Sequence, residues 1–197
     1  MKKIPRLSLL VLLFAPAAYG QRALFAGAGP LMEVGLGYSN VEGNIPSQSR
    51  LGMNGAQAIF NADFHPRVGV KVDMGYVRNF NAFGSGRTAD ILTYMAGPVF
   101  YPVWKRRMNV YTHVLLGGAR ETGVNFQSNG EIVRGFANRV AWAGGAGFQY
   151  RLARMFAMRV GVDYLHTSFY NSSVALQGQN NVRSSISLIY SFGKNRE

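Results

Sequence analysis

The sequence lacks cysteine and long hydrophobic runs. Without cysteine the chain has no disulfide, no lipid-attachment thiol and no thiolate metal site. Its longest apolar stretch, residues 7–15, is shorter than the roughly 20 residues that a helix needs to cross a bilayer. No later segment reaches that length. If this chain enters a membrane, it must therefore do so as strands.

Acidic residues are also scarce, with 9 Asp and Glu against 21 Lys and Arg in 197 residues. Such an excess of positive charge suggests nucleic acid as one possible partner. Here the basic residues are scattered along the chain, and no cluster of them is interleaved with stacking aromatic residues. The pattern does not favour nucleic-acid binding.

Residues 1–20 have the three parts of a secretory signal peptide. Lys2, Lys3 and Arg6 form the positive start, the apolar stretch follows, and small residues precede the expected cleavage between Gly20 and Gln21. The alternative is an uncleaved N-terminal anchor. Cleavage would leave one domain, residues 21–197, and would lower the formal net charge from +12 to +9.

Most of the remaining sequence alternates between apolar residues and small or charged residues. Val68, Val70, Val72, Met74 and Tyr76 interleave with Gly69, Lys71, Asp73 and Gly75. In a strand, these two sets of side chains point to opposite faces. A charged face needs water or a partner, whereas the apolar face needs a solvent other than water. A closed barrel in a membrane provides both, and it leaves no backbone group unpaired in lipid.

Eight alternating segments can be marked along the chain. They run over about residues 31–39, 53–64, 67–77, 90–101, 108–119, 140–151, 155–165 and 182–192. Connections after the second, fourth and sixth segments are short, and the other four are long: 40–52, 78–89, 120–139 and 166–181. The pattern predicts an all-β fold, an eight-stranded antiparallel up-and-down transmembrane β-barrel with its short turns and both termini in the periplasm.

Aromatic residues concentrate near both ends of the segments, as expected of a barrel with two membrane interfaces. Near the short turns these are Phe64, Phe100, Tyr150, Phe156, Tyr190 and Phe192. Near the long connections they are Tyr38, Tyr76, Tyr94, Trp142 and Tyr164. The simpler explanation, that aromatic residues favour strands, accounts for their presence but not for this distribution.

Beyond the second belt, an anionic lipopolysaccharide surface is the expected partner of four arginines. They are Arg78, Arg87, Arg134 and Arg139.

Small residues share one face of the sixth segment. Ala141, Ala143, Gly145 and Gly147 are expected to make room for bulky side chains inside the barrel, or to ease strong curvature.

The alternation also assigns a set of polar side chains to the barrel interior. They are Glu33, Gln57, Lys71, Asp73, His113, Gln149, Arg159, Asp163 and Arg183. Opposite charges in a narrow lumen should pair, because an unpaired buried charge is very costly. Such a network either fills and stiffens the barrel or forms a gated, narrow ion path. Eight strands are too few for a wide diffusion pore.

The last segment ends like the C-terminal signal read by the outer-membrane assembly machinery. Ser187 precedes two aromatic residues, Tyr190 and Phe192, at alternate positions. Together with residues 95–98, 112–120, 162–167 and 179–183, this segment resembles small outer-membrane barrels of the outer membrane protein A type. The resemblance implies a Gram-negative outer-membrane location, with outer-membrane lipids and lipopolysaccharide as partners. The peptidoglycan-binding domain that often follows such barrels is not expected.

One spacing raises an enzymatic alternative. His166 and Ser168 resemble the His-x-Ser pair of certain outer-membrane lipid A deacylases, but residues 169–196 contain no acid to orient the histidine. Asp163 should point into the lumen instead. We therefore expect no catalytic site, and neither a cofactor nor a metal is indicated. A soluble barrel carrying an apolar ligand would need the opposite arrangement of faces.

Overall fold

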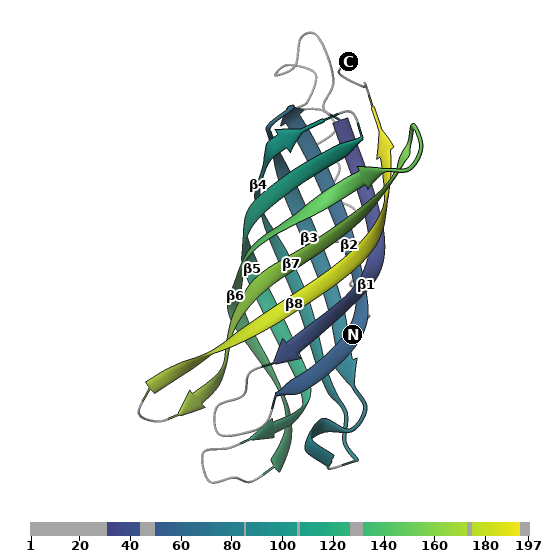
Figure 1. Ribbon diagram of the computed structural model, residues 1–197. Helices are drawn as coiled ribbons and strands as arrows, with labels where there is room; N and C mark the ends of the chain where they lie inside the picture. Colours follow the sequence, from purple (N-terminus) through teal and green to yellow (C-terminus); the bar gives the residue numbers. More distant parts are fainter. Residues whose placement is uncertain are drawn as a thin grey trace, which may run out of the picture.

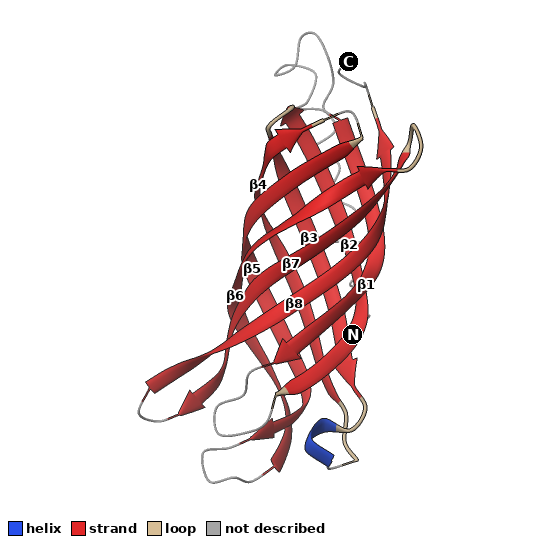
Figure 2. Cartoon of the chain, viewed as in Figure 1, coloured by secondary structure: helices blue, strands red, loops and turns tan. Residues whose placement is uncertain are grey.

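The computed structural model is a closed β-barrel (Figures 1 and 2). It describes residues 31–43, 50–84, 86–105, 107–126, 132–172 and 175–193. The proposed signal peptide, with its expected cleavage at Gly20 and Gln21, lies outside the described residues. No helix in the described part is long and apolar enough to cross a membrane.

Eight strands follow one another along the chain and around the barrel. They are β1 (Leu31–Gly43), β2 (Leu51–His65), β3 (Val68–Asn79), β4 (Ala89–Trp104), β5 (Met108–Phe126), β6 (Ile132–Arg151), β7 (Phe156–Ser172) and β8 (Ala175–Phe192). Each pairs antiparallel with the next, and β1 pairs with β8 to close the barrel. The predicted fold class and strand number are confirmed.

Several strands are longer than the sequence indicated. β5 continues to Phe126 and β6 begins at Ile132, so most of the predicted connection 120–139 is paired strand. The predicted connection 166–181 is likewise mainly strand, because β7 reaches Ser172 and β8 begins at Ala175. These predictions of long loops were wrong, since polar and Gly-rich composition concealed the strand pairing.

The extended parts form two ribbons that leave the barrel wall. Pairing between β6 and β7 begins only at Ala141 and Thr167, while β5–β6 and β7–β8 remain paired well beyond that level. In Figure 1 the two ribbons project from the lower end of the barrel and diverge. The wall is therefore complete along its middle and open between β6 and β7 at this end.

The connection between β3 and β4 folds back over the same end. It contains a short 3-10 helix, η1 (Ala82–Gly84), drawn in blue in Figure 2. Ala82 is fully buried there, and its backbone N–H donates to the carbonyl of Arg87. The connection thus supplies a side chain to the barrel interior.

Small residues on β6 make space for lumen side chains, as the sequence predicted. A Cβ on Gly147 would lie 2.1 Å from the Val160 carbonyl and 2.5 Å from the Tyr111 hydroxyl. One on Gly145 would lie 2.0 Å from the Asp163 carboxylate. The bulky interior therefore depends on the absence of side chains at these two positions.

Replacing Gly147 with alanine should destabilise the barrel by about 1–3 kcal/mol, because the new methyl group overlaps backbone and a buried ring. Gly144→Ala is the matched control on the same strand. Its Cβ would find only Trp142 within reach, at 3.9 Å. Urea unfolding in lipid vesicles measures both variants, and equal stability of the two would contradict this packing.

Candidate functional site

The polar side chains predicted for the lumen are all buried inside the barrel. Glu33, Gln57, Lys71, Asp73, His113, Gln149, Arg159, Asp163 and Arg183 are each at most 4% exposed. They come from all the strands except β4, so the site exists only in the closed barrel. The structure divides them into two clusters.

The central cluster is built around Arg183 on β8. Its guanidinium donates to Asp73 Oδ1 at 2.8 Å and to the carboxylate of Asp163, with Nε 2.8 Å from Oδ2. Lys71 Nζ lies 3.0 Å from Asp73 Oδ2, and the amide of Gln57 donates to that oxygen at 2.6 Å. Two cations thus face two carboxylates, and their formal charges cancel.

His113 extends the central cluster toward the short turns. Its Nε2 lies 3.1 Å from Asp163 Oδ1. The imidazole stacks on Tyr111, with ring centroids 5.8 Å apart and an interplanar angle of 11°. Tyr111 separates the two clusters, because Lys71 Nζ and Arg159 Cζ both lie near its ring, at 6.0 and 5.0 Å from the centroid.

The short-turn cluster pairs Arg159 with Glu33. Arg159 Nη2 lies 2.6 Å from Glu33 Oε2, and its guanidinium also donates to the side-chain carbonyl of Gln149. Glu33 accepts further hydrogen bonds from Gln149 at 2.7 Å, from Asn61 at 3.2 Å and from Ser191 at 3.3 Å. Its carboxylate therefore has several donors from different strands.

An apolar layer, which sequence reasoning did not anticipate, fills the end of the lumen at the long connections. It consists of Val41, Leu51, Met53, Val77, Ala82, Ala89, Ile91, Met95, Leu115, Ala119, Ala141, Ala143 and Leu165. Every one of these side chains is less than 9% exposed, and several are fully buried. Packed hydrocarbon thus covers the ionic clusters over much of this side, with the buried polar side chains of Thr93, Thr167 and Asn181 among it.

Other lumen residues were also missed. Asn61 and Asp63 share the inward parity of Gln57, so extending the alternation along β2 would have found them. Tyr101 bridges these two, because Asn61 donates to its hydroxyl at 3.3 Å and that hydroxyl donates to Asp63 at 3.2 Å. Glu121 is 6% exposed but was assigned to a loop, since the length of β5 was underestimated.

The arginines assigned to the surface lie mainly on strands rather than in loops. Arg78 is on β3, where it binds Asp90 through two hydrogen bonds of 2.6 and 2.8 Å. Arg139 is exposed on β6, and Arg87 is exposed before β4. Arg134 also belongs to β6, but its side chain lies outside the described residues.

The His166 side chain has an amide partner instead of a carboxylate. Its Nδ1 lies 2.9 Å from Asn180 Oδ1, and its ring stacks on Trp142 at 5.5 Å. Asp163 faces the lumen and binds Arg183, while the Ser168 side chain lies outside the described residues. Within the described ranges, no group of three His, Asp or Glu residues has a metal-binding arrangement.

The predicted aromatic belts lie on the outer face of the barrel. Tyr38, Tyr76, Tyr94, Trp142 and Tyr164 are 39–51% exposed at one end. At the other end, Phe100, Tyr150, Phe156 and Tyr190 are 37–45% exposed, and Phe64 and Phe192 are half-buried. In the terminal strand Ser187 faces the lumen, whereas Tyr190 packs against Phe192 with ring centroids 6.1 Å apart.

Comparison with known proteins identifies relatives of this fold. The family model for the outer membrane protein beta-barrel domain matches residues 7–192. No curated protein matches the chain.

Three solved barrels illustrate the structural likeness. Neisserial surface protein A superimposes with a TM-score of 0.61 at 11% identity, over 83% of this chain and 97% of that one. The attachment invasion locus protein of Yersinia pestis, solved with the heparin analogue sucrose octasulfate, has a TM-score of 0.57 at 16% identity, over 83% of this chain and 99% of that one. OprG of Pseudomonas aeruginosa has a TM-score of 0.55 at 13% identity, over 85% of this chain and 98% of that one. At these identities the likeness shows the fold alone.

Replacing Arg183 with glutamine should destabilise the barrel by about 3–5 kcal/mol, because Asp73 and Asp163 would lose their shared cation. Arg154→Gln removes the same charge from an exposed turn and should change stability by no more than about 0.5 kcal/mol. Urea unfolding in vesicles, followed by tryptophan fluorescence, measures both. A small effect of Arg183→Gln would mean that the cluster contributes little to stability.

Proposed function

Because the chain belongs to the outer-membrane β-barrel family and lies in the Gram-negative outer membrane, we propose that it is a closed, non-enzymatic barrel. Its role would be to support the outer leaflet and to present its long connections and strand ribbons at the cell surface. The partners in this proposal are outer-membrane lipids and lipopolysaccharide.

The filled lumen is the observation that carries this proposal. A conducting path needs continuous water, and hydrophobic constrictions block ions by excluding it. Here the apolar layer covers the central cluster, and Leu115 and Leu165 within it are fully buried. The charged side chains below form ion pairs with one another.

The outer face supports the membrane placement of this closed barrel. Large apolar side chains point outward at mid-height, among them Leu36 at 72% and Leu116 at 65% exposure. Lysine or arginine toward lipid at this depth would cost about 2–4 kcal/mol. The charged residues of the same strands, such as Lys71 and Arg159, are buried in the lumen.

A narrow ion channel is the second candidate, and the central cluster favours it. Arg183 and Lys71 both contact Asp73. If one of these cations moved away, the other would still neutralise the carboxylate, so the ion pairs could rearrange without leaving Asp73 unpaired. Conduction would also require the apolar layer to part. The closed barrel requires neither rearrangement, which is why we prefer it.

Lipid A hydrolysis has less support. A serine nucleophile needs a base that is oriented by an acid. The described contacts of His166 are Asn180 and Trp142, neither of which is acidic.

We further propose that the assembly machinery reads Ser187, Tyr190 and Phe192 during insertion.

The absence of cysteine makes the proposed orientation directly testable. Arg87→Cys and Arg154→Cys place single thiols at exposed positions on opposite ends of the barrel. In intact cells a membrane-impermeant maleimide should label Arg87→Cys, while Arg154→Cys should react only after the outer membrane is opened. Labelling in the reverse pattern would invert the orientation.

Purified protein in planar bilayers should show no single-channel openings. Replacing both Leu115 and Met95 with glycine should allow conductance, because it thins the apolar layer above the ionic clusters. Leu116→Gly is the control, since this neighbour of Leu115 points toward lipid. Stepwise openings of the wild-type barrel would contradict the closed-lumen proposal and favour the channel.

A further inference from the structure

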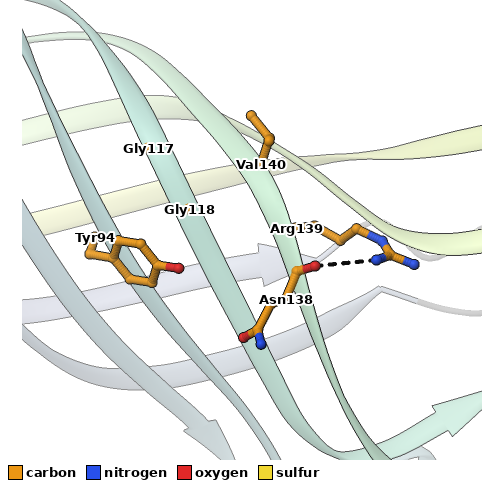
Figure 3. A pocket seen from close by; sticks show the side chains of 6 residues that line it. All are labelled: Tyr94, Gly117, Gly118, Asn138, Arg139 and Val140. Atoms are coloured by element: carbon orange, nitrogen blue, oxygen red, sulfur yellow. Dashed lines mark hydrogen bonds between the residues drawn. The ribbon is translucent and has the colours of Figure 1, made fainter.

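A shallow pocket lies on the outer end of the wall formed by β4, β5 and β6. Its volume is about 370 Å³. The lining residues are Tyr94, Gly117, Gly118, Asn138, Arg139 and Val140, drawn in Figure 3. Under the proposed orientation, this pocket is at the level where headgroups of the outer leaflet begin.

A glycine on β5 lets an aromatic ring lie flat against the wall at this pocket. Gly118 is paired with Tyr94 on one side and with Val140 on the other, and both neighbours point outward. A Cβ on Gly118 would lie 2.5 Å from the Tyr94 hydroxyl, so the phenol ring lies directly over this glycine. The tyrosine ring thus fills the space above Gly118, and the valine stands on the other side of this position.

A cationic side chain lies next to the polar lining residue Asn138, just outside the pocket itself. Arg120, two residues beyond Gly118 on β5, lies between Leu92 and Asn138 in the strand register. Its guanidinium carbon is 5.2 Å from the centroid of the Phe136 ring, which holds the side chain at the surface. Arg120 forms no ion pair with an acid in the part of the chain that the structure describes.

This freedom distinguishes Arg120 from Arg78. Both arginines are next to exposed aromatic rings at the outer end of the barrel, but Arg78 is neutralised by Asp90 at 2.6 Å. Arg120 therefore retains an unmet charge, with the Asn138 amide and the Tyr94 hydroxyl as neighbouring hydrogen-bond donors. These groups together suit a phosphate, which accepts strong hydrogen bonds from guanidinium groups.

The lower end of the pocket is apolar. Leu116 is 65% exposed, and its neighbours on the adjacent strands are the small Ala96 and the belt residue Trp142. Val114 continues the same outward row at 52% exposure. A hydrocarbon chain that descends from the pocket would meet the apolar side chains of Leu116 and Val114 along this row.

We propose that this pocket binds one outer-leaflet lipid with a phosphorylated headgroup, of the lipid A type. Arg120, Asn138 and the Tyr94 hydroxyl would bind the phosphate, and an acyl chain would lie against the Tyr94 ring and along Leu116. The inference deepens the proposed function, because it assigns a defined lipid site to a barrel that otherwise contacts lipid uniformly.

Native mass spectrometry of the folded full chain in a zwitterionic detergent, titrated with lipid A, tests the site. One lipid A should bind the wild type in preference to additional copies, and Arg120→Gln should weaken that binding by roughly 10- to 100-fold, as expected for one charge-assisted hydrogen bond. Arg154→Gln is the matched control, because it removes the same charge from an exposed turn at the opposite end of the barrel.

Three results would overturn the proposal. Equal weakening by Arg154→Gln would indicate a general attraction to positive charge. Equally tight binding of dephosphorylated lipid A would remove the headgroup contact, and displacement of lipid A by excess inorganic phosphate would show that the pocket holds an anion without its acyl chain. None of these three binding results bears on conductance in planar bilayers. The closed-lumen proposal is therefore tested separately from the lipid site.

Discussion

The structure depends on one constraint, the pairing of every backbone N–H and C=O that faces hydrocarbon. An unpaired group there costs several kcal/mol, and lipid offers no substitute partner. The contact between β1 and β8 meets this requirement by joining the first and last strands over eleven residue pairs. Closure then fixes the two faces, since side chains alternate along each strand. Apolar rows meet lipid on one side, and the remaining positions enclose a narrow interior.

Burying a charged side chain in that interior costs free energy, and this cost explains which residues the interior contains. Transfer of a carboxylate or guanidinium from water carries a large desolvation penalty, which only close partners offset. The pairs Arg183–Asp73 and Arg159–Glu33 join strands on different sides of the closure, so these ionic contacts form only when the barrel is complete. We infer that the clusters specify this one closed arrangement. The apolar layer excludes water above them, which strengthens the electrostatic contacts beneath.

Alternation in the sequence was sufficient for the fold class and for the charged clusters of the lumen. Lys71 and Asp73 could be placed because their strand alternates without interruption. Tyr101 and Tyr111 could not, since an aromatic residue suits either face and only three-dimensional packing shows that Gly147 makes room for one of them. The ends of β5 and β6 were missed for another reason. Beyond the barrel wall neither hydrocarbon nor a packed core imposes a period on the side chains, so the sequence there resembles a loop although its backbone is paired.

Outward side chains are also less constrained near the end of the barrel, and this explains where a specific binding site can form on the outer face. At mid-height every outward position must be apolar, so one part of the wall cannot differ much from another. At the level of Tyr94 and Gly118 the surroundings change from hydrocarbon to headgroups, and a charged residue becomes tolerable two positions further along β5. Arg120 can therefore remain unneutralised at the surface, whereas Arg183 in the lumen needs two carboxylates. A tyrosine ring laid over a glycine, next to a tolerated charge, gives this part of the wall a shape and a polarity that the rows below it cannot have.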